Sequence, residues 1–465
     1  MTKLDPLGGN HDRPPVLQTY VATLSSSSSV APGSASTSGL VLAPFRGVRY
    51  AENRVTGLAE VTSPPYDVIA ADNETQLMAA DPHNIVRLIL PRHEAGQPGS
   101  PYEDAAAELA SWLADGILTP DPAPALYVYE QAAPGRGVLQ RGLIGALRLE
   151  PYSARIVQPH EDVAPGPVMG RRQLMEATHA NLEPIFLLYQ GGNGAATALV
   201  DTIAGSRPPL AQASTPDGLR HRLWAITDAD ELSAIAADLA PRTALIADGH
   251  HRYAAYLQLQ DRLREAGAGD GPWDCGLAML VDSTAYPPQL GAIHRVVTGL
   301  VPEAAVRLAS TAFTVRELPG GTADVHAALA ALDDACKRDP VAFLLAGAGR
   351  VHLLTDPDPR QVSAAVPDYP AALWQQLPAA VLEGLLFARI WAIEDDARSV
   401  RTIHDAAEAI GAADAEPTGT AIICGAMSPA QVYEVAALGS RVPRKSTSFG
   451  LKPRTGLVLR LFAEG

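Results

Sequence analysis

Four polar residues follow a short apolar run near the middle of the chain, in the sequence LIADGHHRYAAYL. Asp248 and Gly249 form a tight turn. His250, His251 and Arg252 come directly after it. Arginine grips phosphate oxygens through two parallel hydrogen bonds, and histidine transfers protons near neutral pH. The cluster therefore predicts a site for phosphate chemistry, in which Asp248, His250 and His251 are candidate catalytic residues.

The elements that position this cluster follow from its flanks. The apolar run before the turn and the spacing of the residues after it predict a strand, a turn and a helix. A helix N-terminus carries unpaired backbone N–H groups, and the helix dipole attracts anions there. The predicted phosphate ligands are Gly249, His250, His251 and Arg252. The simpler interpretation is an ordinary turn capped by Asp248, but turn chemistry does not explain two histidines followed by arginine.

Two carboxylate-bearing loops suit the same chemistry. In PPYDV, Asp67 either ligates Mg²⁺ or positions a substrate hydroxyl, or the paired prolines only make a rigid corner. In PHED, His160 and Glu161 are acid–base groups, because a carboxylate near a phosphoryl acceptor can take the hydroxyl proton. Glu161 is also a candidate metal ligand. The alternative for PHED is an exposed polar loop.

Two basic segments offer further phosphate ligands. Arg171 and Arg172 either clamp an anion or cap a surface helix. Near the C-terminus, the segment PRKSTSFGLKPRTG gathers basic residues and hydroxyls in an otherwise acidic chain. From these two segments the candidate phosphate ligands are Arg172, Lys445, Ser446, Thr447 and Lys452. The alternative for the C-terminal segment is a solvated basic loop, since the glycines of a P-loop are missing before K-S-T.

The composition limits the classes of function. The chain has 465 residues, 47% of them hydrophobic and 19% charged, which predicts a globular protein of two or three domains. Its net charge of −15 argues against binding to nucleic acid or to an anionic membrane. Three well-separated cysteines predict neither a zinc module nor a disulfide framework. We find no apolar run of membrane-span length and no secretory signal, so we expect a cytoplasmic protein.

The order of apolar and polar segments predicts an α/β (α+β) protein. Residues 1–40 are rich in Ser, Gly and Pro and predict a disordered tail. Residues 41–300 alternate strand-like and helical patterns, and residues 301–465 form a second α+β domain that contributes the basic loop. Within these domains, residues 85–90 predict a strand, and the runs around GAG near residue 348 predict a hairpin.

Several of these segments together resemble a known family. In order, they are PPYDV, PHED, ADGHHRYAAY, IHRVV and PRKSTSFGLKPRTGLV. This set resembles the uncharacterised bacterial and archaeal DUF1015 family over roughly residues 41–462. The DGHHRY turn is in addition similar to the phosphate-binding turn of ParB-like and sulfiredoxin-like domains, among which are kinases that convert free L-serine to O-phosphoserine with ADP or ATP.

The ParB-like similarity implies a nucleotide-binding core in residues 41–300, in which residues 249–252 cradle the phosphates. In those kinases a glutamate acts as the base toward the serine hydroxyl. That glutamate has no aligned position here, and Glu161 is proposed on chemistry alone. The chain departs from the family that it resembles where F-Y-P-K usually follows K-S-T: here Phe449 and Lys452 are present, but the second aromatic residue is not.

Three hypotheses follow from the sequence. The first is a phosphotransferase acting on a small hydroxyl substrate such as L-serine, with ATP or ADP as donor and Mg²⁺ as cofactor. The second is a phosphatase or nucleotide hydrolase on the same site, in which a histidine can carry the phosphoryl group. The third is a nucleotide-binding regulatory protein. The sequence leaves the acceptor, the donor, the oligomeric state and the reach of the basic loop open, and a homo-oligomer is compatible with it.

Overall fold

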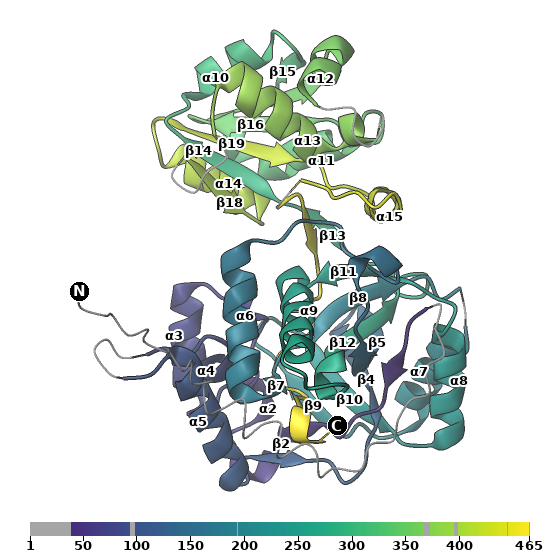
Figure 1. The fold of residues 1–465 in the computed structure, drawn as a ribbon. Helices are drawn as coiled ribbons and strands as arrows, with labels where there is room; N and C mark the ends of the chain where they lie inside the picture. The colour runs from purple at the N-terminus through teal and green to yellow at the C-terminus, as the bar shows by residue number, and fades with distance from the viewer. Residues whose placement is uncertain are drawn as a thin grey trace, which may run out of the picture.

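The computed structural model describes residues 39–93, 98–192, 194–366, 373–394, 399–443 and 445–464. Nearly all of the predicted tail, and Arg444 of the basic loop, lie outside these residues. The fold is mixed α/β, as predicted, and forms two lobes that Figure 1 shows one above the other. Within the described ranges, no helix combines the length and the apolar character that a membrane span requires.

The lower lobe is built on a nine-stranded mixed sheet. Its strands run in the order β6 (Val157–Gln158), β11 (Ala244–Asp248), β8 (Ile185–Tyr189), β12 (Cys275–Asp282), β5 (Gly137–Arg148), β4 (Leu126–Ala133), β10 (Arg220–Ile226) and β9 (Ala211–Ser214), with β1 (Leu42–Ala43) also paired to β5. β8 lies between β11, which is antiparallel to it, and β12, which is parallel. The last residues of β11 and β12 therefore lie at opposite ends of β8.

Both faces of this sheet are covered, which explains its continuous apolar strands. The five residues of β8 are all buried. Leu187 packs in one cluster with residues of α7, α8 and α9, whereas Phe186 and Leu188 pack in another with residues of α5. Successive side chains of a strand point to opposite faces, so a strand covered on both sides is apolar at every position.

Helices surround the lower sheet, and α6 and α9 pack side by side in front of it (Figure 1). The helices of this lobe are α2 (Leu58–Val61), α3 (Ala71–Ala80), α4 (Val86–Ile89), α5 (Pro101–Ala114), α6 (Pro165–Thr178), α7 (Ala195–Ser206), α8 (Ala229–Leu239) and α9 (His250–Glu265). A small ribbon of β2 (Val48–Tyr50) and β3 (Leu118–Pro120) lies beside them.

The upper lobe contains a six-stranded antiparallel sheet. Its strands run in the order β15 (Thr314–Glu317), β17 (Arg350–Thr355), β16 (Phe343–Gly347), β19 (Gly419–Cys424), β14 (His294–Thr298) and β18 (Val400–Ile403). β16 and β17 form the hairpin that the sequence predicts. The helices are α10 (Pro302–Ala309), α11 (Val325–Cys336), α12 (Pro359–Ala365), α13 (Pro378–Val381), a π-helix (Leu382–Trp391), α14 (Ala406–Asp414) and α15 (Pro429–Ala437).

A two-stranded ribbon connects the lobes. β13 (Leu290–Ala292) carries the chain upward, and β20 (Thr447–Phe449) brings it back and pairs with β13 antiparallel (Figure 1). The chain then ends in the lower lobe, where β21 (Arg460–Leu461) pairs with β7 (Ala180–Asn181). The upper lobe is therefore inserted between two segments that both belong to the lower lobe.

One sequence prediction of secondary structure is wrong. Residues 85–90 form the short helix α4 rather than a strand. The carboxamide oxygen of Asn84 accepts the backbone N–H of Val86 at 2.9 Å, as a residue at a helix start does. Three of the four helix residues are buried, and the pattern of so short a run does not distinguish a strand from a helix.

Candidate functional site

The DGHHR turn has the strand–turn–helix form that the sequence predicts. Asp248 ends β11, Gly249 has a φ of +92°, and α9 begins at His250. Only glycine adopts this left-handed φ without strain. A Cβ on Gly249 would also lie 3.1 Å from Nε of Arg252, so the guanidinium of Arg252 occupies the space beside this glycine. The residue at the N-cap of α9, Gly249, has no side chain and makes no capping hydrogen bond.

Four charged side chains meet at this turn, and we call them the ionic cluster: Asp67, Asp248, Arg252 and Lys452. Lys452 Nζ and one terminal nitrogen of Arg252 both contact the carboxylate of Asp248. Asp67 lies on the outer side, with its Oδ1 3.8 Å from Lys452 Nζ. Asp248 and Arg252 are buried, whereas Asp67 is exposed. The C-terminal loop therefore does reach the turn.

The charges of the ionic cluster stabilise one another. Burial alone raises the pKa of Asp248, but the cations of Lys452 and Arg252 outweigh it and hold the pKa of this carboxyl below its usual value. Burial favours the neutral amine of Lys452, but the carboxylates of Asp248 and Asp67 raise the pKa of this lysine. Asp248 is therefore a carboxylate, and Lys452 an ammonium, at neutral pH.

The guanidinium of Arg252 bridges the turn to the start of β8. One terminal nitrogen donates to Asp248, and the other donates to the carbonyl oxygen of Pro184 at 2.6 Å. The buried Nε has no hydrogen-bond partner among the described residues. The sequence predicts that Arg252 grips phosphate through two parallel hydrogen bonds. The structure instead uses both terminal nitrogens internally, and the Nε–H group is the donor that the protein leaves without an acceptor.

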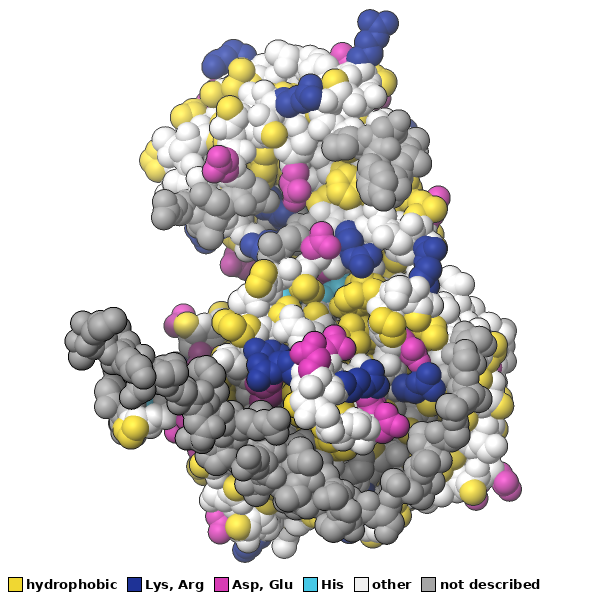
Figure 2. Space-filling model, viewed as in Figure 1, with side chains coloured by type: hydrophobic (Ala, Val, Ile, Leu, Met, Phe, Trp, Pro, Cys, Tyr) yellow, Lys and Arg dark blue, Asp and Glu magenta, His cyan; other side chains and the backbone are white. Residues whose placement is uncertain are grey.

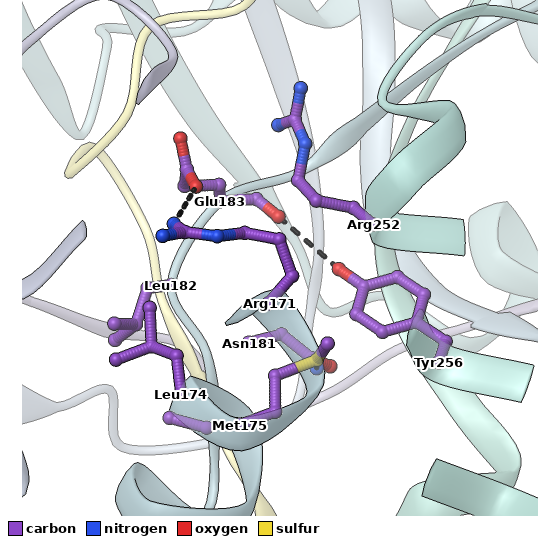
Figure 3. Close-up of a pocket in the computed structure, with 9 residues that line it drawn as sticks. Arg171, Leu174, Met175, Asn181, Leu182, Glu183, Arg252 and Tyr256 are labelled. Atoms are coloured by element: carbon purple, nitrogen blue, oxygen red, sulfur yellow. Dashed lines mark hydrogen bonds and ion pairs between the residues drawn. The ribbon is translucent and has the colours of Figure 1, made fainter. Parts of the chain in front are cut away.

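Tyr66 holds the Asp67 loop against the site. Its ring lies 4.2 Å from the guanidinium carbon of Arg171, and its backbone N–H donates to Oε1 of the buried Glu183 at 3.0 Å. Figure 3 shows Arg171 and Glu183 facing each other, 3.6 Å apart, in a cavity that Arg252 also lines. This cavity of about 20 Å³ has room for one water molecule, so it is too small for a nucleotide or an amino acid.

His160 ties the PHED loop to both chain segments of the site. Its Nδ1 donates to the carbonyl oxygen of Ile246 at 2.7 Å, and its Nε2 accepts from the hydroxyl of Thr447 at 3.0 Å. Its ring also packs edge-on against Phe449, with 5.3 Å between ring centroids. Burial lowers the pKa of His160 to about 4. This histidine is therefore a neutral tether between β11 and β20 at physiological pH.

The histidines of α9 are also held by protein groups. The backbone N–H of His160 donates to His250 Nε2 at 3.3 Å, which places the ring proton on Nδ1, 3.3 Å from the carboxylate of Glu161. Burial, followed by the neighbouring His160, lowers the pKa of His250 well below its usual value. The backbone N–H of Ala164 donates to Nε2 of the half-buried His251 at 3.1 Å. Glu161 therefore orients His250 and lies at the surface of the same network.

Three predicted phosphate ligands contact other parts of the protein. Arg172 donates to Glu176, one helical turn further along α6, at 2.6 Å. Lys445 Nζ lies 3.3 Å from the hydroxyl of Thr402 in the upper lobe. The hydroxyl of the buried Ser446 donates to the carbonyl oxygen of a preceding proline at 2.6 Å. The structure thus brings Lys452 to Asp248 and Thr447 to His160, and gives these three side chains different partners.

The upper lobe faces the ionic cluster as well. His404 follows β18, and its pKa is lowered first by burial and then by the cation of Lys452, with Asp67 opposing. Arg295 on β14 donates to the carbonyl oxygen of Lys445 at 3.2 Å. Figure 2 shows the surface hollowed between the lobes on one side, and histidine atoms in the seam where the lobes meet. The site therefore lies at the junction of the two lobes.

The predicted metal ligands do not form a metal cage. Asp67 faces Lys452 and Glu161 faces His250, so each carboxylate already has a nitrogen partner. Within the part of the chain that the structure describes, no three His, Cys, Asp or Glu side chains are grouped closely enough to hold a metal ion. These residues alone do not fit a resident Mg²⁺ ion, which needs near-octahedral oxygen ligands.

Two site residues were not found from the sequence. Glu183 is a buried carboxylate directly before Pro184 and the apolar strand β8. A charged residue next to a fully apolar strand was the feature of the sequence that could have indicated its role. Arg454 belongs to the basic segment that the sequence predicts to bind phosphate or to be solvated, but it is buried and donates to the hydroxyl of Thr62 at 2.7 Å. It anchors the loop that carries Lys452, and periodicity gives no signal for such a contact.

The comparisons with known proteins come from sequence families and solved structures. The family described as "Protein of unknown function (DUF1015)" matches residues 42–380. No curated protein matches the chain. Free serine kinase in complex with AMP aligns with 64% of this chain and 84% of its own, at 15% identity and a TM-score of 0.31. SbnI with a C-terminal truncation, from Staphylococcus aureus, aligns with 68% of this chain and 87% of its own, at 11% identity and a TM-score of 0.33.

A conserved hypothetical protein from Pyrococcus furiosus aligns with 67% of this chain and 94% of its own, at 15% identity and a TM-score of 0.33. Identities and TM-scores of this size carry no conclusion about the activity of this chain. The match to the family covers most of the sequence, and it includes the turn, the PHED loop and the Asp67 loop.

Proposed function

The chain belongs to the DUF1015 family, and we propose that it is a nucleotide-dependent phosphotransferase that acts on a small hydroxyl substrate. Free L-serine, with O-phosphoserine as product, is the first candidate, because the DGHHRY turn is similar to that of ParB-like domains. The observation that carries the proposal is the contact of Lys452 Nζ with Asp248 at the start of α9. It brings a cation from a distant segment to a helix N-terminus whose N-cap residue, Gly249, makes no capping hydrogen bond.

The phosphates of the donor would lie at the start of α9. Backbone N–H groups and the positive end of the helix dipole favour an anion there. Lys452 supplies a point charge, and Arg252 supplies the Nε–H group that has no described acceptor. Charge stabilisation of this kind dominates phosphoryl transfer, so few groups are required.

Asp67 is the best-placed base. It is exposed beside Lys452, whereas the carboxylate of Asp248 is buried under two cations. In the proposed step, the substrate oxygen forms a bond to the terminal phosphorus of the nucleotide while the bridging P–O bond breaks. Asp67 takes the hydroxyl proton, and the nucleotide leaves with the electron pair of the broken bond. Glu161, the earlier candidate for the base, is engaged with His250.

The histidines are proposed to hold the site rather than to carry phosphate. A phosphohistidine needs an imine nitrogen with a free lone pair. His250 Nε2 and His251 Nε2 each accept a backbone N–H, and His160 Nε2 accepts the hydroxyl of Thr447. These bonds argue against the hydrolase hypothesis in its phosphohistidine form. Since the carboxylates do not form a metal cage, any Mg²⁺ would arrive with the nucleotide phosphates.

The test combines binding with turnover. We expect the protein to bind ADP or ATP in isothermal titration, and to form O-phosphoserine when L-serine and Mg²⁺ are added, as measured by mass spectrometry. A Lys452→Met variant should lose both nucleotide binding and the formation of O-phosphoserine. Lys337→Met is the matched control, because Lys337 is an exposed lysine paired with Asp334. Donor binding without turnover on any small alcohol would favour the regulatory hypothesis, and absence of nucleotide binding would contradict the proposal.

A further inference from the structure

Two buried glutamines hold the backbone that carries Lys452. Gln140 Nε2 donates to the carbonyl oxygen of Leu451 at 2.9 Å and to Gln131 Oε1 at 3.0 Å. Gln131 Nε2 donates to the carbonyl oxygen of Lys452 at 3.1 Å. The two glutamines are 1% and 3% exposed, so these hydrogen bonds form away from solvent. Together they attach residues 451 and 452 to the central sheet of the lower lobe.

The sheet is irregular at this point. Gln131 on β4 and Gln140 on β5 are direct cross-strand partners, and the register shifts immediately after Gln131, where Ala132 pairs with Val138. One residue of β5 is therefore left over, which makes a β-bulge. Bulges occur next to functional sites because they re-aim a side chain. Here the irregularity sits beside the one pair of glutamines that reaches the C-terminal loop.

The held backbone is itself unusual. Leu451 has a φ of +54°, in the left-handed region that a branched side chain rarely adopts. The backbone N–H of Gly450 donates to the carbonyl oxygen of Gln289 at 2.7 Å, which fixes the loop on its other side. Such a conformation persists only where the surrounding structure determines it. The hydrogen bonds from Gln131 and Gln140 hold this conformation on the side of the lower lobe.

We infer that Gln131 and Gln140 are positioning residues for Lys452. They hold the backbone of residues 451 and 452, so that the lysine ammonium meets Asp248 at the start of α9. A lysine side chain has a flexible four-carbon stem, so a fixed backbone is what limits where its ammonium can lie. Only the consequence for nucleotide binding rests on the proposed function.

The alternative is that the two amides simply satisfy buried polar groups of the lobe. Both roles predict a loss of stability when the amides are removed. Only the positioning role predicts that Lys452 becomes exposed while the rest of the protein does not. The chain is well suited to this test, because its sequence contains just four lysines: Lys3, Lys337, Lys445 and Lys452.

The experiment measures acetylation of each lysine by mass spectrometry in the full chain. In a Gln131→Leu, Gln140→Leu double variant we expect the acetylation rate of Lys452 to rise about tenfold, with Lys337 and Lys445 unchanged. Gln260→Leu is the matched control, because Gln260 is also a buried glutamine, and its amide donates to Asp274 at 2.8 Å. The control should lower the melting temperature without changing the rate at Lys452.

Two results would overturn the inference: an unchanged rate at Lys452 in the folded double variant, or an equal rise in the control. If the double variant does not fold, the single variants Gln131→Leu and Gln140→Leu decide the question in the same way, with a smaller expected rise. ADP affinity separates this inference from the proposed function. If the wild-type protein binds no ADP, the proposed function fails, and the acetylation rates still decide whether the glutamines position Lys452.

Discussion

Two buried aspartates end strands on either side of β8, at opposite ends of the same sheet. Asp248 ends β11 and pairs in register with Phe186, whereas Asp282 ends β12 and pairs with Tyr189. Burial alone would raise the pKa of both carboxyls, but the partners of each carboxylate lower its pKa below the usual value. The partners, however, differ in kind. Asp282 accepts from neutral donors, namely the backbone N–H groups of Gly191 and Thr284 and the hydroxyl of Thr197.

The difference separates a structural carboxylate from a functional one. The donors of Asp282 carry no charge, so its end of the sheet holds a single satisfied anion. Asp248 instead holds the cations of Arg252 and Lys452 together. With Asp67, the ionic cluster contains two cations and two carboxylates, so an arriving anion competes with these carboxylates for the two cations. A buried carboxylate therefore indicates a ligand site when its partners are cations and one of them comes from a distant segment.

The largest expected effect comes from neutralising each of the two buried aspartates in turn. Asp248→Asn leaves two cations without their carboxylate, so we expect a loss of about 3–5 kcal/mol in the free energy of unfolding. Asp282→Asn should cost about 1.5–3 kcal/mol, because the amide still accepts some of the same hydrogen bonds. Urea unfolding measures both values.

Ligand binding sharpens the same comparison. With Asp248 neutralised, the two cations should bind ADP or inorganic phosphate roughly tenfold more tightly, since charge-assisted hydrogen bonds are the strong ones. Asp282→Asn should leave that affinity unchanged. Equal affinities in the two variants would mean that the ends of the sheet do not differ as we describe.

The next largest effect is a dependence on pH that belongs to the Asp248 end. His160 has a folded pKa of about 4, below its unfolded value near 6.5. Between these values the unfolded state binds more protons, so the stability that the neutral ring contributes is complete above pH 6.5 and is lost as pH falls toward 4. The loss reaches roughly 3 kcal/mol at most.

Urea unfolding of His160→Asn between pH 4 and 7 measures this contribution. The variant should show a flatter fall in stability than the wild-type protein, although His221 and His294, whose pKa values are also about 4, keep part of the slope. The donors to Asp282 do not titrate in this range, so Asp282→Asn should keep the full slope. A variant slope equal to that of the wild type would place the titration elsewhere.

Replacing the glycine that lies near each aspartate should give a smaller loss of stability. A Cβ on Gly191 would lie 2.1 Å from Asp282 Oδ2, and a Cβ on Gly249 would lie 3.1 Å from Arg252 Nε. Each alanine variant should lose about 1–3 kcal/mol of stability, through crowding at Gly191 and mainly through backbone strain at Gly249. Gly249→Ala should also weaken ADP binding, because it displaces Arg252. Thermal unfolding with and without ADP tests this difference, and a similar loss of affinity in Gly191→Ala would contradict it.

The smallest expected effect is at Arg172, which the sequence predicts as a phosphate ligand. Its guanidinium pairs with Glu176 on the same helix. Arg172→Ala should therefore change stability by less than about 1 kcal/mol and leave ADP affinity unchanged, as measured by isothermal titration. A large loss of affinity would show that Arg172 moves to the phosphates when nucleotide binds, and would extend the site along α6.

The parts of the site that depend on local sequence were predictable. The turn at Asp248 and Gly249 has a strand signal before it and a helical pattern after it, and the structure has both elements. The mixed α/β fold likewise follows from alternating patterns. The strand predicted at residues 85–90 was wrong because so short a run, buried at most of its positions, has no diagnostic period.

The contacts that assemble the site were not predictable in this way. Lys452 and Asp248 are far apart in the sequence, and no periodicity connects them. The guanidinium of Arg252 donates to the carbonyl oxygen of Pro184, and this contact exists only when β8 lies beside β11 in the folded protein. The glutamine pair depends on a β-bulge between β4 and β5, which the pattern of apolar and polar residues does not predict. Long-range pairing therefore decided which of the basic residues reach the turn.

The return of the chain through β20 has a consequence for synthesis on the ribosome. The upper lobe is contiguous in sequence between β13 and β20, so all of it emerges before the segment that carries Lys452 and β21. Domains generally fold as units in the order of their synthesis, but the lower lobe starts first and is completed last. A nascent chain therefore presents Asp248 and Arg252 without their lysine partner until the upper lobe and residue 452 have been synthesised, and a product truncated before this residue lacks the assembled site.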